Sequence, residues 1–127
     1  MSSFTDFLEN ELLDHAFRGA SWTAPSSVHL ALFTANPSDS GGGTEVSGSG
    51  YSRQAITFGA ASAGAISNTA AVAFTASGGS FGSVTAIGIF DAATTGNMLA
   101  WDAITSATVG DGDTITFAIG DIDISLT

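Results

Sequence analysis

"VTAIGIF", residues 84–90, is the stretch of sequence that decides the fold of this chain. Its apolar residues occupy both alternating sets of positions, which is typical of a central strand covered on both faces of its sheet. Gly88 has no side chain, so a large neighbouring side chain can approach the strand closely there. We therefore expect residues 84–90 to form the centre of a sheet, with a helix covering one of its faces.

Similar runs continue on both sides of this stretch. Short segments rich in β-branched and aromatic residues alternate with Gly, Ser, Asn and Asp, which is a pattern of strands and turns. The pattern predicts a mainly β fold, a single antiparallel β-sandwich or small barrel of about seven strands. Besides residues 84–90, the predicted strands are 28–34, 51–58, 71–75, 98–102, 114–119 and 121–126.

The run "TITFAIGDIDISL", residues 114–126, changes its buried face. Apolar residues occupy odd-numbered positions as far as Ile119 and even-numbered positions from Ile122 onward. A strand keeps one buried face unless a bulge or bend intervenes, and glycine permits such a bend. The chain is therefore expected either to kink at Gly120 and Asp121 or to pass there from one sheet to another.

An amphipathic helix is predicted at residues 3–18. Ser3 and Asp6 have the spacing of a capping box, in which each side chain can satisfy a free amide at the helix start. Arg18 suits the negative end of the helix dipole, and Gly19 can adopt the left-handed turn that ends a helix. The apolar stripe of this helix comprises Phe4, Phe7, Leu8, Leu12, Leu13, Ala16 and Phe17.

The helix and the strands divide the chain into two parts. Residues 1–19 are the N-terminal amphipathic helix, and residues 20–127 are the β-sandwich domain, with a Gly/Ser-rich loop at 38–50. The apolar face of the helix can pack on its own sheet, which we expect, or lie on a partner, as exposed apolar helix faces commonly do.

Charge and composition exclude several classes of function. Twelve acidic residues face two basic ones, Arg18 and Arg53, so the net charge is -10 and no lysine is present. Direct binding to nucleic acid or to an anionic membrane is therefore not expected. No apolar run reaches the roughly 20 residues of a membrane span, and we expect no signal peptide. Cysteine is absent, which excludes disulfides and thiolate metal sites.

The low proportion of charged residues favours assembly. Only 11% of the residues are charged, against about 25% in an average globular domain. A domain that stays alone in solution needs a well-charged surface. We therefore expect neighbours to cover much of this surface, in a homo-oligomer or a larger assembly. The alternative is a monomer whose negative charge alone keeps copies apart.

The glycine-rich stretch "SGGGTEVSGSGYSRQAITF", residues 40–58, does not fit a phosphate site. Phosphate-binding loops need a helix after the glycines, and Walker-type loops also need a lysine, whereas here a strand is predicted to follow. Residues 38–50 are interpreted as a pliant surface loop that leads into a strand. Glu45 and Arg53 are expected to pair and fasten the loop; the alternative is that Arg53 contacts an acidic groove on a partner.

No catalytic, cofactor or metal site is predicted. Two pairs of alternating carboxylates could ligate calcium, but Asp-Gly is also a common turn pair and the complete EF-hand spacing is missing. The histidines are expected on the flank of the helix and on the solvent side of a strand, without metal-ligand spacing. No nucleophile elbow lies between a strand and a helix, so we expect no enzyme. The residues considered are Asp111, Asp113, Asp121, Asp123, His15 and His29.

Most aromatic residues at alternating strand positions are expected in the core, although Trp22, Trp101, Tyr51 and the nine phenylalanines could stack on sugars. Trp22 stands out because it lies in the linker "GASWTAP", outside any predicted strand. The candidate contacts with a partner are Phe4, Phe7, Trp22, Glu45 and Arg53.

A resemblance to a known family rests on five segments that cover nearly the whole chain. They are "FLENELLDHAFRG", "VHLALFTANPSDSGGGTEVSGSGYSRQAITFG", "AISNTAAVAF", "GSVTAIGIFDAATTGNMLAW" and "GDTITFAIGDIDISL". Together they resemble a family of small structural proteins of tailed bacteriophages, labelled tail-fibre-like proteins, minor virion proteins or head decoration proteins. The resemblance implies a single β-domain behind a short N-terminal helix, without catalytic residues, in a virion assembled in the host cytoplasm.

Within that family, the residues favour a place on the phage head. A fibre needs length from repeats or a coiled coil, and this chain has neither. The first hypothesis is therefore a capsid decoration or cement protein that binds the outside of the major capsid protein lattice and stabilises the head, with small gains multiplied over symmetric sites. The alternative is a tail or tail-fibre component, and a second alternative is a carbohydrate-binding attachment module.

Overall fold

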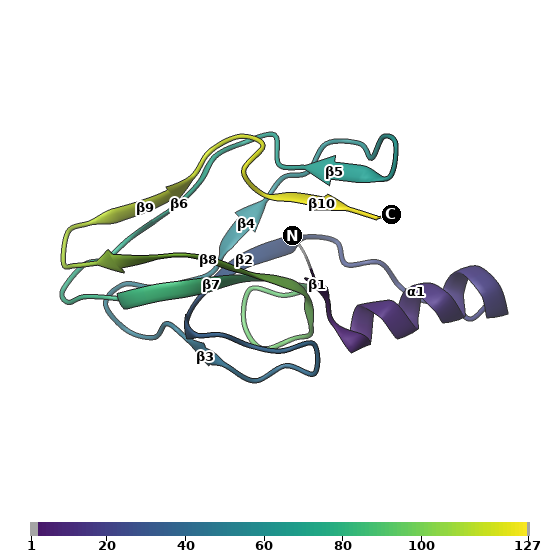
Figure 1. Ribbon diagram of the computed structural model, residues 1–127, viewed down its shortest axis with the longest axis horizontal. Coiled ribbons are helices and arrows are strands. Elements are labelled where there is room, and N and C mark those ends of the chain that lie inside the picture. Colours follow the sequence, from purple (N-terminus) through teal and green to yellow (C-terminus); the bar gives the residue numbers. More distant parts are fainter. Residues whose placement is uncertain (1–2, 127) are drawn as a thin grey trace.

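Ten strands and one helix follow one another along residues 3–126, the part of the chain that the computed structural model describes (Figure 1). The fold is therefore mainly β with one short helix, as the sequence predicts. In chain order the elements are β1 (Ser3–Phe4), α1 (Asp6–Arg18), β2 (Val28–Ala35), β3 (Thr44–Glu45), β4 (Gln54–Ile56), β5 (Ala65–Ser67), β6 (Val72–Thr75), β7 (Gly82–Phe90), β8 (Met98–Val109), β9 (Thr114–Phe117) and β10 (Asp123–Ser125).

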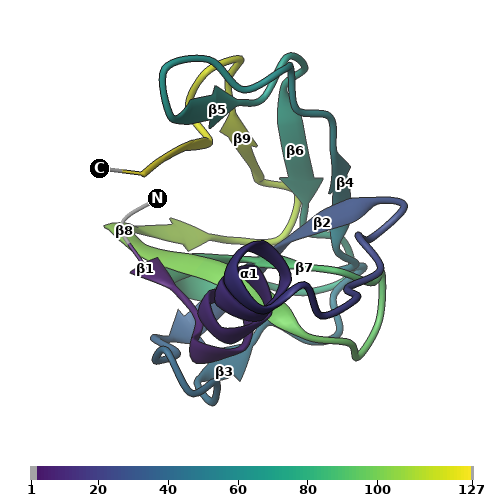
Figure 2. The same ribbon diagram turned by 90° about the vertical axis from the view of Figure 1, so that its right-hand side faces the viewer.

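The strands form one large and two small sheets, and all the pairings are antiparallel. The large sheet has the order β1-β8-β7-β2-β3, and β4 also pairs with β2. The small sheets are the pairs β6–β9 and β5–β10. Figure 2 shows both small sheets on one side of the large sheet. The expected sandwich-like arrangement is thereby confirmed, and the described strands close no barrel.

The main core lies between these two layers. β7 pairs with β2 on one side and with β8 on the other, so residues 84–90 do form the centre of the large sheet. Its inward side chains meet those of the small sheets and exclude water, which is the main favourable contribution to folding. The buried residues of this core include Leu30, Leu32, Val72, Phe74, Val84, Ile87, Ile89, Phe117 and Ile122.

The opposite face of β7 is buried by side chains of the sheet itself. The rings of Phe33 and Phe90 stack 6.2 Å apart on this face. A Cβ atom at Gly88 would lie 2.9 Å from Cε1 of Phe33 and 3.0 Å from Sδ of Met98, so the close approach predicted at Gly88 is confirmed. The expectation that the helix covers this face is wrong. α1 contacts β8 and β1, and it extends away from the end of the sheet (Figure 1).

The helix begins later than predicted because β1 precedes it. Ser3 and Phe4 pair with β8, which holds their backbone extended, and Thr5 is the residue that caps the helix. The Thr5 hydroxyl oxygen accepts a hydrogen bond of 3.4 Å from the amide of Leu8, so the predicted capping box of Ser3 and Asp6 is wrong. The end is as predicted, since Gly19 has the left-handed φ of 67°.

The strand boundaries differ most where the amino-acid pattern is weakest. β8 continues to Val109, well beyond the predicted end at residue 102. Ala103, Ala107, Thr108 and Val109 pair with β7, although most side chains of residues 103–109 are small or polar. The predicted strand 51–58 shrinks to β4. The short strands β1, β3 and β5 escape prediction, since two or three residues show no periodicity.

The change of buried face after β9 marks a passage between sheets. β9 pairs with β6 and β10 pairs with β5, and Gly120 between them has a φ of 84°. Asn68, which is 1% exposed, secures this passage. Its side-chain oxygen accepts hydrogen bonds of 3.0 Å from the amides of Gly120 and Ile122, and its nitrogen donates to the carbonyl of Ala118 at 3.0 Å. Of the two predicted outcomes, a kink within one strand or a passage from one sheet to another, the passage is the one that occurs.

Candidate interaction site

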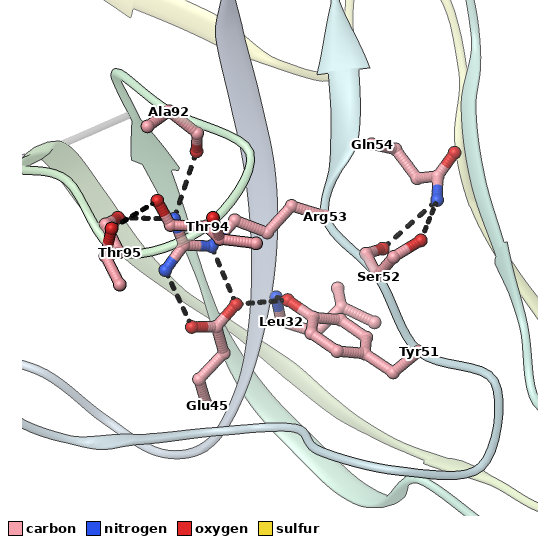
Figure 3. A network of polar contacts seen from close by, with 9 residues as sticks. All are labelled: Leu32, Glu45, Tyr51, Ser52, Arg53, Gln54, Ala92, Thr94 and Thr95. Carbon is pink, nitrogen blue, oxygen red and sulfur yellow. Dashed lines mark hydrogen bonds and ion pairs between the residues drawn. The ribbon is translucent and has the colours of Figure 1, made fainter.

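Figure 3 shows a network of polar contacts that is centred on a salt bridge between Arg53 and Glu45. Nε of Arg53 donates to Oε2 of Glu45 at 2.9 Å, and Nη2 donates to Oε1 at 2.9 Å, so the pair is bidentate. The remaining nitrogen, Nη1, donates to the carbonyls of Ala92 at 3.0 Å and Thr95 at 2.7 Å. The predicted pairing of Glu45 and Arg53 is confirmed.

Tyr51 ties this salt bridge to the core. Its hydroxyl donates to Oε2 of Glu45 at 2.6 Å and accepts from the amide of Leu32 at 3.1 Å. The Tyr51 ring stacks on Phe74 with the centroids 5.9 Å apart and meets Phe81 edge-on at 5.8 Å. A residue proposed as a sugar-stacking surface is therefore part of the protein's own packing.

The network shifts the pKa of each of its ionisable groups. Burial alone raises the pKa of Glu45, but hydrogen bonds from Arg53 and Tyr51 outweigh it and hold that pKa below the ordinary value of 4.5. The hydrogen bond to Glu45 raises the pKa of Arg53. Burial, together with the hydrogen bond to Glu45, raises the pKa of Tyr51. At neutral pH the site is thus an ion pair with a protonated phenol beside it.

The segment at 38–50, predicted as a loop, contains a short strand and an isolated bridge. Thr44 and Glu45 form β3 against β2, and Ser38 pairs with Gly41 in an isolated bridge. The Arg53 side chain is only 7% exposed and the Glu45 side chain 27%. The guanidinium therefore joins residues 44–53 to the loop between β7 and β8, and its role as a direct contact with a partner stays a prediction.

Three of the four acidic residues considered as calcium ligands bond to backbone amides. Asp111 accepts from the amide of Gly78 at 3.0 Å, and Asp113 accepts from the amide of Gly110 at 2.9 Å. Asp121 accepts from the amide of Ala118 at 2.9 Å. Within residues 3–126, no three acidic or histidine side chains gather as metal ligands would.

His29 does not face solvent as expected. It lies on β2 between Ala55 of β4 and Phe90 of β7, and is half-buried because strands flank β2 on both sides. Its Nδ1 atom is buried without a hydrogen-bond partner among the described residues. His15 lies exposed on α1, and its Nδ1 atom is 2.9 Å from the carbonyl oxygen of Ala20.

An apolar groove opens at the end of the molecule that carries α1. It has a volume of about 280 Å³ and lies between the large sheet and the β5–β10 pair. No charged residue lines it. Figure 1 places α1, β5 and β10 at this same end. The large side chains around the groove are Phe4, Leu8, Val28, Phe58, Ile66, Ile89, Leu99, Ile124 and Leu126.

The candidate contacts chosen from the sequence do not converge on one site. Phe4 lines the apolar groove, whereas Phe7 lines a separate hollow of about 480 Å³. Trp22 is half-exposed in the segment between α1 and β2. Glu45 and Arg53 lie in the polar network.

The helix α1 is attached at its start, and most of its last six residues, 13–18, are exposed. The Thr5 amide donates to the carbonyl of Leu99 at 2.9 Å, and the Thr5 hydroxyl donates to the carbonyl of Met98 at 2.6 Å. Leu8 is the buried side chain of the helix. Leu13 is 55% exposed and Phe17 is 82% exposed, an arrangement that the sequence pattern alone does not reveal. Among the described residues, no helix is long and apolar enough to cross a bilayer.

Comparison with protein families gives one finding over most of the chain. The model of the family described as "Podophage GP4 fiber I protein gp80" matches residues 3–125. No curated protein matches the chain. The family match spans the helix, all three sheets and every residue named around the apolar groove except Leu126.

Proposed function

Because this chain belongs to the podophage GP4 fiber I protein gp80 family, it is a structural protein of the phage virion, and we propose that it is a component of a virion fibre. The virion assignment agrees with the resemblance of the sequence motifs to tailed-phage structural proteins. The observation that carries the fibre proposal is the match over residues 3–125, which takes in nearly the whole chain.

We further propose that the protein acts by binding, without catalysis. The polar network around Arg53 uses its donors and acceptors inside the protein. Three of the four aspartates considered as ligands accept backbone amides in turns. The surface also carries an apolar groove and an exposed helix face, which suit association with other virion proteins.

Decoration of the capsid, the first hypothesis from the sequence, is kept as the second candidate. The short length of the helix favours this candidate. α1 has 13 residues and is only about 20 Å long, which is too short to span a distance as a fibre does. Repeats and heptads that could give length are absent from the sequence. A fibre built from this chain therefore has to gain its length by association, so a homo-oligomer is part of the proposal.

The location of the protein on purified virions tests both candidates. Quantitative mass spectrometry gives the number of copies relative to the major capsid protein, and cryo-electron microscopy of the same particles gives their position. A small number of copies at the tail or on projecting fibres supports the fibre. Copies spread over the capsid lattice in fixed ratio to its subunits support decoration. Particles that lack the protein contradict both.

A further inference from the structure

The outward face of α1 combines two acidic residues with two large apolar ones. Asp6, Glu9, Leu13 and Phe17 follow one another at three- and four-residue spacing, which places them along one side of a helix. All four are exposed, whereas Leu8, which points toward the sheet, is buried. The side of the helix turned away from the body is therefore acidic at its start and apolar at its end.

The apolar half of this face is left largely uncovered by the described chain. Leu13 and Phe17 are two of the four large apolar side chains that are exposed within residues 3–126. They lie one helical turn apart, and Figures 1 and 2 show α1 projecting from the end of the sheets. Isolated exposed apolar residues are ordinary, but a matched pair on a projecting helix is the pattern of anchors that enter a groove.

The charge of the chain decides what kind of groove fits. α1 carries four carboxylates and one guanidinium, so its net charge is -3 in a chain of -10. Both arginines of the chain pair with its own carboxylates, Arg53 with Glu45 and Arg18 with Asp14. A second copy has no lysine, and its exposed arginine, Arg18, lies on the same acidic helix, so a second copy offers no Lys- or Arg-rich surface to meet Asp6 and Glu9. Like charges brought together at an interface oppose association, whereas complementary ones favour it.

We propose that α1 is the attachment helix of this protein, and that it docks in an apolar groove with a Lys- or Arg-rich end on a different virion protein. Leu13 and Phe17 enter the apolar part of the groove, and Asp6 and Glu9 meet its basic end. The inference rests on the proposed place of the protein in the virion and adds the chemistry of its partner.

Competition for incorporation into virions tests this attachment. Host cells that produce the phage also supply a tagged copy, and the ratio of tagged to native protein in purified virions is compared with the ratio in the lysate. Tagged wild-type protein reports on the virion assignment itself, since its absence from particles contradicts the proposed function. The double variant Leu13→Ala/Phe17→Ala reports on the helix, and Ile119→Ala, which alters a 68% exposed apolar residue elsewhere, is the matched control.

We expect the control to enter virions as the wild type does and the double variant to enter about tenfold less, because anchor residues dominate binding. Glu9→Gln is expected to lower incorporation about two- to threefold, because one carboxylate no longer meets the basic end of the groove. Unchanged melting temperatures show that the variants are folded. Incorporation of the double variant at the wild-type level overturns the attachment role of α1.

A photo-crosslinking residue at position 17 identifies the partner. On intact virions, crosslinks to a peptide of a different virion protein, next to Lys or Arg, are expected. Crosslinks to a second copy of this chain overturn the proposed partner, as does a monomer–oligomer equilibrium in sedimentation that Leu13→Ala/Phe17→Ala abolishes.

Discussion

The guanidinium carbon of Arg53 lies 3.7 Å from the centroid of the Phe90 ring, so the planar group covers the ring while its edge pairs with Glu45. In this geometry the Arg53 side chain stacks on an aromatic ring and forms hydrogen bonds at the same time. The flat face of the guanidinium shields an aromatic ring at the end of β7, and its nitrogens reach acceptors that lie around it. One side chain thereby links the end of β7, β3 and the loop that follows Phe90.

Replacement of Arg53 by Ala is expected to lower the free energy of unfolding by about 2–4 kcal/mol. The change leaves Glu45 partly buried without its counter-ion and removes the donors to Ala92 and Thr95. Arg53→Lys is expected to recover only part of the loss, because an ammonium group cannot make the bidentate pair. Urea denaturation of the purified protein measures both effects.

The other arginine of the chain provides the control for this prediction. Arg18 pairs with Asp14 on the exposed surface of α1, and such pairs contribute about 0–1 kcal/mol. Arg18→Ala should therefore change stability little. Equal losses for Arg18→Ala and Arg53→Ala would contradict the role assigned to the buried network.

The contribution of Glu45 to stability is expected to depend on pH. Its folded-state pKa lies below the ordinary 4.5. The stabilisation is therefore fully present above the unfolded-state pKa and is lost as pH falls through the folded-state pKa. Unfolding free energies of the wild type and of Glu45→Gln, compared from neutral pH down to about pH 3, should converge on acidification. A difference in unfolding free energy between the two proteins that stays constant over this pH range would contradict the prediction.

Gly88→Ala is expected to destabilise the protein by about 1–3 kcal/mol through overpacking. The new methyl group would lie 2.9 Å from the Phe33 ring and 3.0 Å from Sδ of Met98, so both must move. Ser83→Ala is the control on the same strand, because Ser83 is exposed. Thermal unfolding distinguishes the two, and a Gly88→Ala protein as stable as the control would show that this face repacks without cost.

Asn68→Ala is expected to be among the most damaging single changes, at about 3 kcal/mol or more. It leaves the buried amide of Ile122 without its partner, and it also removes the side-chain hydrogen bonds to the amide of Gly120 and the carbonyl of Ala118. Asn68→Asp keeps the acceptor but buries a charge and loses the donor, so it should not rescue. Hydrogen exchange at Ile122 measures the effect locally, and unchanged protection there would contradict the assigned role.

Part of the candidate site can be predicted from the sequence because the choices are few. The chain has two arginines, and one of them follows Glu45 closely, so their pairing is a short inference. The hydrogen bonds of the Tyr51 hydroxyl to Glu45 and Leu32 could not be predicted in the same way. An aromatic residue at the start of a strand is expected to pack in the core, and this expectation says nothing about its polar partners. The role of Asn68 could not be predicted from its neighbours, because apart from the carbonyl of Ala70 its side-chain partners lie 50 to 54 residues further along the chain.

The amino-acid sequence by itself determined the local features of this protein: a mainly β fold, a central strand at 84–90, a helix that ends at Gly19, and a change of buried face at Gly120. Each depends on neighbouring residues, whose periodicity and backbone freedom act over a few positions. Only the tertiary structure decided that α1 projects from the end of the sheets instead of covering a face. That outcome depends on the pairing of Ser3 and Phe4 with Trp101 and Ala100, a contact between distant segments that no local pattern encodes.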